Sequence, residues 1–468
     1  MKIQIRPPHI VASLLLLISL SACEPKGNSQ NSTPADSLAA ASTEIVVGDT
    51  AKMIDSYLSQ LVKDKGFSGG LLILRNGQKI LSKGYGFENK EAGKAFTSAT
   101  LASMGSITKA FTATAILKLE EEGRLKVEDR LDKHFPDVPK DKAGITLHQL
   151  LTHSSGMQDF LKNDGGDYAK VETEEFLRRA WAEPLVFAPG SNAIYSNMGM
   201  SILGILIEQL TGMEYEEYLR QHVLSPIGIH NIGYHRTSGA DSVAHGYEGG
   251  KDWGTIPLRF KEAGGGPYWN LKGNGGLEAN LQDMALWINA FTDAKVLSKA
   301  NIDRMFTAHV QEEGYGGESY FGYGCNVTKS RRGTKVIDNG GSNGIYHARM
   351  LRYADEGLVF YLVTNENKVN ANKVMPNVTQ LYFMGKIVED GLTALPPFES
   401  PEAEQIFGWM SKDPNLDLAK ELKASGLDIK DDMILLDAGR HLIQSEQPAA
   451  AKTLFMHYTK AFPKIIIA

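Results

Sequence analysis

Two short apolar runs flank an Asn-Gly pair early in the chain. Residues 70–75 read Gly-Leu-Leu-Ile-Leu-Arg and residues 78–81 read Gln-Lys-Ile-Leu, with Asn76 and Gly77 between them. Asn-Gly suits the tight turn in which both residues have positive φ, so this pattern predicts an antiparallel hairpin. Apolar residues at helical spacing over 50–64 predict an amphipathic helix directly before it. A helix that leads into an antiparallel hairpin favours an α+β fold over a parallel βαβ fold.

Later segments extend this sheet and add helices. The sequence predicts helices at 106–122, 145–153, 195–212, 214–222 and 280–293. Strand-like runs return at 320–327, 334–338, 345–353 and 357–364. We therefore expect a sheet built from both ends of the domain, with helices inserted between its two halves.

The chain totals set limits on the class of protein. Its 468 residues predict one large domain with appendages, or two domains, because domains of roughly 100–200 residues are usual. The formal charge of −6 is mild and excludes a basic surface for nucleic acid. Only two cysteines, Cys23 and Cys325, are present, which excludes a disulfide framework, and we expect Cys325 to be a lone buried thiol.

The N-terminus has the pattern of an export signal. Lys2 and Arg6 precede an apolar run over 11–20, which is too short for a membrane span and ends at Leu20-Ser21-Ala22-Cys23. This ending resembles a bacterial lipobox, in which the cysteine is lipidated. We therefore expect a lipoprotein signal peptide over 1–23, with Cys23 anchoring the protein to the cell envelope facing the periplasm, in the outer membrane. An ordinary secretory signal with an incidental cysteine is the alternative.

Two further segments flank the domain that we expect over 49–392. Residues 24–48 are rich in Ser, Ala, Asn, Thr and Pro and predict a flexible tether. After a composition break at Leu395-Pro396-Pro397, residues 398–468 are charged and helical. Five of them fall at the spacing of a single tetratricopeptide-type helix pair: Leu435, Gly439, Ala451, Phe455 and Pro463. Such a pair would pack on the larger domain or dock a protein partner; a plain helical hairpin is the alternative.

The segment Ser106-Ile107-Thr108-Lys109 precedes a helix-forming run. A serine and a lysine three residues apart share one helix face, so hydroxyl and amine come within hydrogen-bonding reach. A desolvated lysine has a lowered pKa, and its neutral amine can take the serine proton. Alone, the pattern is more typical of an N-capping serine with a solvent-exposed lysine; its flanks and the second element below favour catalysis.

A second candidate element is Tyr195-Ser196-Asn197, which follows the turn at Pro189-Gly190. The Tyr195 phenol can exchange protons with the nucleophile and the leaving group, and the Asn197 amide can bind the substrate carbonyl or orient the lysine. Another Tyr-x-Asn occurs at 268–270, in a glycine-rich stretch with no helix behind it, and we interpret that copy as structural.

These motifs, with their flanks, resemble the penicillin-recognising serine hydrolases related to class C β-lactamases, D-alanyl-D-alanine carboxypeptidases and family esterases. The resemblance covers roughly residues 50–390, and its flanks include 84–86, 121–125, 150–156, 275–277 and 363–365. It implies an antiparallel sheet flanked by helices, a mainly helical second lobe, and an active site between the lobes.

The family's third motif is a Lys or His, any residue, then Gly, on a strand that lines the cleft. Here the matching segment is Asp338-Asn339-Gly340-Gly341-Ser342, which places Asn339 at the basic position, or Asp338 after a one-residue shift. Either way the cation that would bind a substrate carboxylate is missing. Neutral esters or amides are then favoured over β-lactams and D-alanyl carboxylates, unless His347 or Arg349 compensates.

The resemblance implies that Ser106 attacks a carbonyl, that Lys109 and Tyr195 share its proton, and that an acyl-enzyme forms. The backbone N–H groups of Ser106 and Ser342 would form the oxyanion hole, with Asn197, Asn339 and Gly341 beside the substrate. We expect a small-molecule or peptide substrate and no cofactor. A catalytically weak or inactive binding or scaffold lipoprotein is the main alternative. A metal site on His148 and His153 is disfavoured, because their spacing is not i, i+4 and no carboxylate completes it.

Overall fold

The computed structural model describes residues 44–234, 242–312, 319–392, 400–427, 429, 433–445 and 447–461. In this part of the chain a nine-stranded sheet forms the centre, and every neighbouring pair in it is antiparallel. Its order is β1 (Ile45–Val46), β3 (Gln78–Tyr85), β2 (Gly69–Arg75), β15 (Leu358–Thr364), β14 (His347–Tyr353), β13 (Lys335–Ser342), β12 (Asn326–Lys329), β11 (Tyr320–Phe321) and β10 (Val310–Gln311). The N-terminal strands β1–β3 and the later strands β10–β15 therefore meet where β2 pairs with β15, and the α+β fold expected from the sequence is confirmed.

The predicted hairpin is β2 and β3, and the turn between them explains its sequence. Asn76 has φ 49° and Gly77 has φ 77°, so both residues take the positive φ that the turn requires. Helix α2 (Asp49–Lys65) precedes the hairpin and ends at Gly66, whose φ is 70°. Ile45 and Val46, assigned from the sequence to the end of the tether, instead form strand β1, because they pair with Leu81 and Ser82 at the sheet edge.

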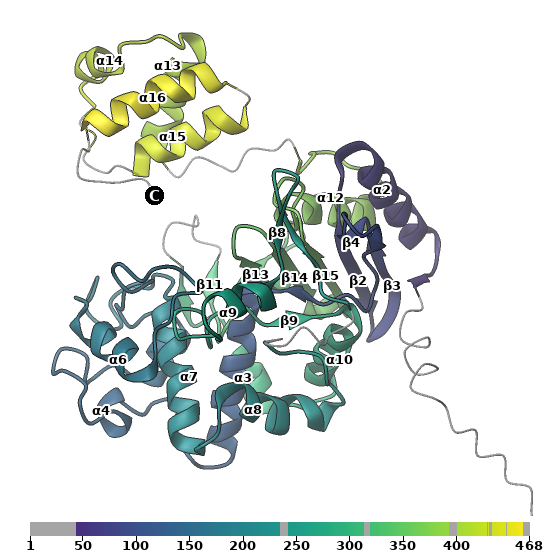
Figure 1. Ribbon diagram of the computed structural model, residues 1–468, viewed down its shortest axis with the longest axis vertical. Coiled ribbons are helices and arrows are strands. Elements are labelled where there is room, and N and C mark those ends of the chain that lie inside the picture. The colour runs from purple at the N-terminus through teal and green to yellow at the C-terminus, as the bar shows by residue number, and fades with distance from the viewer. Residues whose placement is uncertain are drawn as a thin grey trace, which may run out of the picture. The chain divides into compact units, whose positions relative to one another are not determined.

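The two faces of the sheet carry different partners. On one face Ile73, Phe360 and Leu351 lie side by side across three strands and pack against α2 and α12 (Ala371–Met384). Figure 1 shows these two helices beside the sheet strands β2, β3, β14 and β15. On the opposite face Leu72, Tyr361 and Met350 pack toward the inserted helices. This second face adjoins the helices that carry the candidate site.

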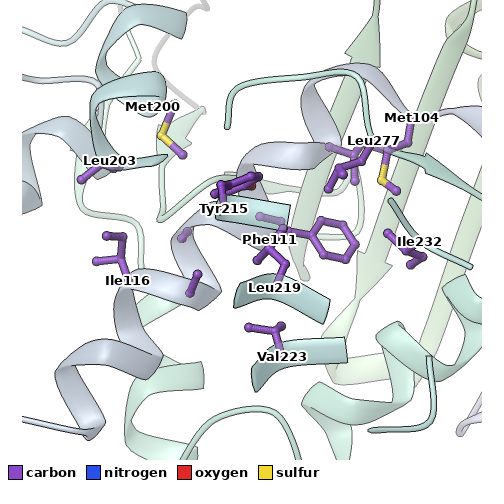
Figure 2. Close-up of a cluster of buried hydrophobic side chains, with 14 of the residues drawn as sticks. Met104, Phe111, Ile116, Met200, Leu203, Tyr215, Leu219, Val223, Ile232 and Leu277 are labelled. Atoms are coloured by element: carbon purple, nitrogen blue, oxygen red, sulfur yellow. The ribbon is translucent and has the colours of Figure 1, made fainter. Parts of the chain in front are cut away.

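The inserted helices surround α3 (Thr108–Glu121), which is buried on nearly all sides. Its neighbours are α7 (Asn197–Thr211), α8 (Tyr215–Tyr218) with the π-helical turn η2 (Leu219–Leu224), and α10 (Leu281–Thr292). Figure 2 shows Phe111 and Ile116 of α3 among side chains of these elements, including Leu203, Tyr215 and Val223. The remaining elements are η1 (Gly105–Ile107), α4 (Leu131–His134), α5 (Leu147–Leu151), α6 (Thr173–Ala182), η3 (Ser225–Ile227), α9 (Ile256–Glu262), α11 (Lys299–Met305), η4 (Ala354–Glu356) and the short paired strands β4 (Phe87–Asn89) with β5 (Lys94–Ala95), β6 (Ala102–Ser103) with β9 (Glu278–Ala279) and β7 (Gly246–Glu248) with β8 (Lys251–Gly254).

The C-terminal segment holds four helices rather than the single pair expected from the sequence. They are α13 (Pro401–Lys412), α14 (Leu418–Ser425), α15 (Met433–Gln444) and α16 (Pro448–Ala461), and they share one hydrophobic cluster. The first two helices contribute Ile406, Met410 and Leu418 to it, which gives α15 and α16 an apolar surface to pack on. A side chain at Gly439 would lie 2.3 Å from the Phe455 ring, so glycine there permits the close crossing of α15 and α16. The tetratricopeptide resemblance itself stays a prediction.

Several expectations fall on other parts of the chain. The signal peptide with Cys23, most of the tether, the break at 395–397 and Pro463 lie outside the described residues. Throughout the described residues, no helix has both the length and the apolar character needed to cross a membrane. Cys325 is a buried free thiol, as expected.

Candidate active site

Ser106 lies in the 3-10 turn η1, directly before α3. The preceding strand β6 pairs with β9, which holds this turn at the edge of the helical part. Strand β13 crosses the turn closely: a side chain at Gly105 would meet the Ser342 backbone nitrogen at 2.5 Å, and one at Gly341 would meet the Met104 carbonyl at 2.0 Å. Gly341 therefore serves as a close-packing position that brings the Ser342 backbone beside the nucleophile.

Lys109 is the second residue of α3 and is almost completely buried. Its Nζ atom lies 3.1 Å from Ser106 Oγ, 2.6 Å from Asn197 Oδ1 and 2.6 Å from the carbonyl oxygen of Asn274. Burial lowers the pKa of Lys109 to about 7, although the carboxylates of Asp159 and Asp167 oppose this shift. An amine with this pKa is partly neutral at physiological pH.

The partners of Lys109 fix where its lone pair points. The Asn197 Oδ1 and Asn274 carbonyl oxygens can only accept hydrogen bonds, so they take the two hydrogens of the neutral amine. The lone pair then faces the third partner, Ser106 Oγ, which is the geometry of a general base beside its nucleophile.

Tyr195 completes this group. Its phenol is close enough to the Ser106 side chain for that side chain to moderate the phenol's pKa, and its ring centre lies 4.7 Å from Lys109 Nζ. Burial raises the pKa of the Tyr195 phenol above its ordinary value. Ser106, Lys109 and Tyr195, chosen from the sequence, are thus brought together in one cluster.

Asn197 is the first residue of helix α7, within the helix predicted over 195–212. Its backbone N–H and its side-chain amide both donate to Asp159 Oδ1, each at 2.9 Å. Because Asp159 takes the N–H₂ end of the amide, the oxygen end faces Lys109. Asn197 therefore orients the lysine, one of the two roles expected of it.

His153 contacts the segment Tyr195-Ser196 that leads into α7. Its Nδ1 accepts the Ser196 backbone N–H at 3.1 Å, and its ring lies 4.7 Å from that of Tyr195. Burial, with a smaller contribution from Lys109, lowers the pKa of His153 to about 3, so the imidazole is neutral. His148 Nδ1 lies 2.7 Å from the Tyr323 hydroxyl, so both histidines bond to protein groups.

The register of β13 decides which residue stands at the third-motif position. Asn339 pairs with Met350 and so lies on the sheet face toward the inserted helices, whereas Asp338 pairs with Leu351 on the face toward α2 and α12. Asp338 binds Arg349 on that far face, with 2.7 Å between Oδ2 and Nη2. Asn339 therefore occupies the basic position, and Arg349 does not replace the missing cation.

Asn339 does not reach the cleft either. Its side chain is buried and donates to the Gly324 carbonyl at 2.8 Å. A side chain at Gly324 would meet the Lys109 carbonyl at 2.5 Å, so this loop lies directly on α3. The substrate contact expected of Asn339 is thus replaced by a packing role behind Lys109.

A cleft of about 50 Å³ opens at Ser106. Its lining includes Asp167, Tyr168, Asn197, Ser342 and Asn343, and none of the described lining residues is Lys or Arg. Asn343 donates to the Tyr168 hydroxyl at 3.2 Å, which joins the end of β13 to the loop that carries Asp167. Burial, reinforced by Asp164, raises the pKa of Asp167.

Three groups of this site were not predicted from the sequence: Asp159, Asp167 and the Asn274 carbonyl. Asp159 and Asp167 follow the Leu150–Gly156 flank but belong to no motif. The second Tyr-x-Asn has a structural role, as interpreted: Asn270 donates to the carbonyls of Asp164 and Gly166 and so holds the Asp167 loop.

Comparison with known proteins agrees with this geometry. The Beta-lactamase family model matches residues 54–381, well over half of the chain. The chain belongs to the beta-lactamase family. The four C-terminal helices lie beyond the match to this family.

Three members or neighbours of the family illustrate its range. The putative penicillin-binding protein PbpX of Bacillus subtilis is 28% identical over 287 residues, which are 61% of this chain and 67% of that protein. The octameric penicillin-binding protein homologue from Pyrococcus abyssi has a TM-score of 0.63 at 26% identity, covering 77% of this chain and 82% of that one. EstCE1, a hydrolase with promiscuous acyltransferase activity, shares the fold with a TM-score of 0.61 at 20% identity. The match covers 71% of this chain and 98% of EstCE1.

Proposed function

We propose that this beta-lactamase family member is a serine hydrolase that acts through an acyl-serine intermediate on an ester, amide or β-lactam carbonyl. The observation that carries the proposal is the hydrogen bonding of Lys109, whose two acceptor partners direct its lone pair to Ser106 Oγ. A family member that had lost catalysis would have no need to keep this amine buried and oriented.

In the proposed mechanism, neutral Lys109 takes the Ser106 proton as Oγ attacks the substrate carbonyl carbon. The negative oxygen that develops is stabilised by the backbone N–H groups of Ser106 and Ser342, a contribution that is usually the largest in such sites. Tyr195, protonated at neutral pH because its pKa is raised, gives its proton to the leaving group. Water then hydrolyses the acyl-serine, and the proton transfers run in reverse.

The charges around the cleft narrow the class of substrate that we propose. Asp167 lines the cleft, no lysine or arginine is among its described lining residues, and Asn339 is turned away. A carboxylate on the substrate would therefore meet a carboxylate and no cation. We propose neutral acyl groups, or acyl groups that carry an amine, as the preferred substrates.

The test is a side-by-side assay of wild type and Ser106→Ala with p-nitrophenyl esters, nitrocefin and D-alanyl peptides. We expect turnover of esters, or of amine-bearing peptides, above that of nitrocefin, and loss of turnover in Ser106→Ala. Absence of turnover for every substrate would favour the alternative of a binding or scaffold protein, for which the lost basic residue at 339 is the supporting observation.

We further propose that the protein is an exported lipoprotein anchored through Cys23 and facing the periplasm, with the C-terminal helices as a protein-docking element. The lipobox-like ending Leu20-Ser21-Ala22-Cys23 supports this. Radiolabelled palmitate should label the wild type and not Cys23→Ala. Equal labelling of both forms would exclude the anchor.

A further inference from the structure

A second and much larger cavity lies at the far end of strand β13 from the active site. Its volume is about 670 Å³, within the range of small-molecule sites. It is lined by the start of β13 at Lys335 and the end of β14 at Tyr353, whereas Ser342 of the catalytic cleft ends β13. About seven residues of strand, roughly 23 Å, separate the two ends, so this cavity is distinct from the cleft.

Most of the lining is apolar. Side chains come from the sheet and from α10 and α11, among them Leu74, Ile288, Phe291, Ile302, Phe306 and Ile337. An apolar cavity of this size suits the hydrocarbon or aromatic body of a small molecule.

Arg352 is the one buried charged residue among the described residues of this lining. It is 9% exposed, and its guanidinium donates to the Ile288 carbonyl at 2.8 Å and to Thr292 Oγ1 at 3.5 Å. A guanidinium has five N–H donors, and neither of these two acceptors is charged. No carboxylate of the described residues forms an ion pair with it, and burial lowers its pKa to about 10, which leaves it charged at neutral pH.

The other charged groups of the lining favour an anion as well. Lys335 lines the cavity, and Asp303, the one carboxylate among the described lining residues, lies 3.0 Å from Lys299 Nζ. A buried charge normally has a partner, because removing an ion from water is costly. In the described part of the chain the Arg352 guanidinium has no carboxylate partner: its neighbours are two neutral oxygens and the rings of Phe291 and Phe306, whose centres lie 5.7 Å from Cζ.

We propose that this cavity binds a monocarboxylate with an apolar body, such as a medium-chain fatty acid, whose carboxylate pairs with the Arg352 guanidinium. The planar fork of arginine matches a carboxylate through two parallel hydrogen bonds. The apolar lining then covers the hydrocarbon body. This inference does not depend on the catalytic proposal, because no residue is shared between the two cavities.

The competing interpretation is structural: Arg352 binds the Ile288 carbonyl near the C-terminal end of α10, where a cation favours the helix dipole. That role requires no ligand. The two interpretations differ in whether a carboxylate is bound more tightly than an uncharged molecule of the same length.

The test is to measure the dissociation constants of decanoate, below its micelle-forming concentration, and of decanol for the full chain by isothermal titration calorimetry. We expect decanoate to bind at least about tenfold more tightly than decanol, the size of one charge-assisted hydrogen bond. Arg352→Met should abolish this preference, and Arg349→Gln, which changes an arginine already paired with Asp338, should retain it. Ile302→Trp, which fills the cavity and leaves Arg352 in place, should weaken both ligands.

Equal binding of decanoate and decanol by the wild type would overturn the proposal, and this readout stands even if Arg352→Met does not fold. Unchanged decanoate affinity in Ile302→Trp would place the ligand elsewhere and would also overturn it.

Discussion

Asp159 accepts two hydrogen bonds from Asn197 through a single carboxylate oxygen, one from the backbone N–H and one from the side-chain amide. This pairing turns the Asn197 oxygen toward Lys109. Asp159 therefore orients the lysine through Asn197, and it also acts on Lys109 by charge. Asp159 thus has two separable effects on Lys109, one geometric and one electrostatic.

Asp159→Asn separates these effects, because an amide oxygen can still accept from Asn197 while the charge is gone. A nearby carboxylate stabilises the protonated lysine, so removing it should lower the pKa of Lys109 below its present value of about 7. The acidic limb of the kcat/KM profile should move to lower pH, by on the order of one unit. Asp159→Ala, which also removes the acceptor, should lower the rate itself. An acidic limb that stays in place in Asp159→Asn would contradict the electrostatic role.

Asp167→Asn tests the charge preference of the cleft. With Asp167 lining the cleft, a substrate with a free amine should be favoured over its N-acetyl form. The variant should reduce the ratio of kcat/KM for D-alanine p-nitroanilide to that for the N-acetyl compound by about tenfold. Lys170→Gln, which removes an exposed charge outside the cleft lining, is the matched control and should leave the ratio unchanged.

His153 should make the fold sensitive to acid. Its pKa is about 3 in the folded state, against 6.5 when unperturbed, so between these values the unfolded chain binds a proton that the folded chain does not. The contribution of His153 to the free energy of unfolding is therefore fully present above pH 6.5. As the pH drops below 6.5, this contribution falls by about 1.4 kcal/mol per pH unit. His153→Asn removes the titration, and Asn tolerates the positive φ of 55° at this position. Urea unfolding from pH 6.5 to 4.5 should then show a shallower decline, and an identical decline would be inconsistent with a buried neutral His153.

Asn339→Ala distinguishes packing from substrate binding at the third motif. Loss of the amide leaves the Gly324 carbonyl without this donor in a buried position, so the free energy of unfolding should fall by about 1–3 kcal/mol. KM for an uncharged ester should change by less than about twofold, since the side chain does not line the cleft. A raised KM with unchanged stability would return Asn339 to the substrate site.

The elements governed by local chemistry were accessible from the sequence. Asn76 and Gly77 specify their turn through backbone conformations that few other pairs adopt, and Ser106 and Lys109 are three residues apart on one helical turn. Counting along the sequence favoured Asn339 at the basic position but left Asp338 as an alternative. The strand pairing of Asn339 with Met350, and of Asp338 with Leu351, decides for Asn339. Strand registry is a long-range property that neighbouring residues do not encode.

The groups that tune the site were not accessible in this way. Asp159 reaches Asn197 across 38 residues, and the Asn274 carbonyl reaches Lys109 across 165. A backbone carbonyl leaves no mark on the sequence, and an isolated aspartate has no motif. Likewise, the core of the C-terminal helices includes residues of α13 and α14, among them Ile406 and Leu418, which lie outside the five positions that matched a repeat in the sequence.

The central claim is that Ser106 is a nucleophile activated by Lys109, and covalent labelling tests it most directly. The intact protein should be incubated with a fluorophosphonate probe and the modified peptide identified by mass spectrometry, in wild type, Ser106→Ala and Lys109→Met. We predict one adduct on Ser106 in the wild type, none in Ser106→Ala, and labelling slower by several orders of magnitude in Lys109→Met. Undiminished labelling of Ser106→Ala, or an adduct on another residue of the wild type, would contradict the account.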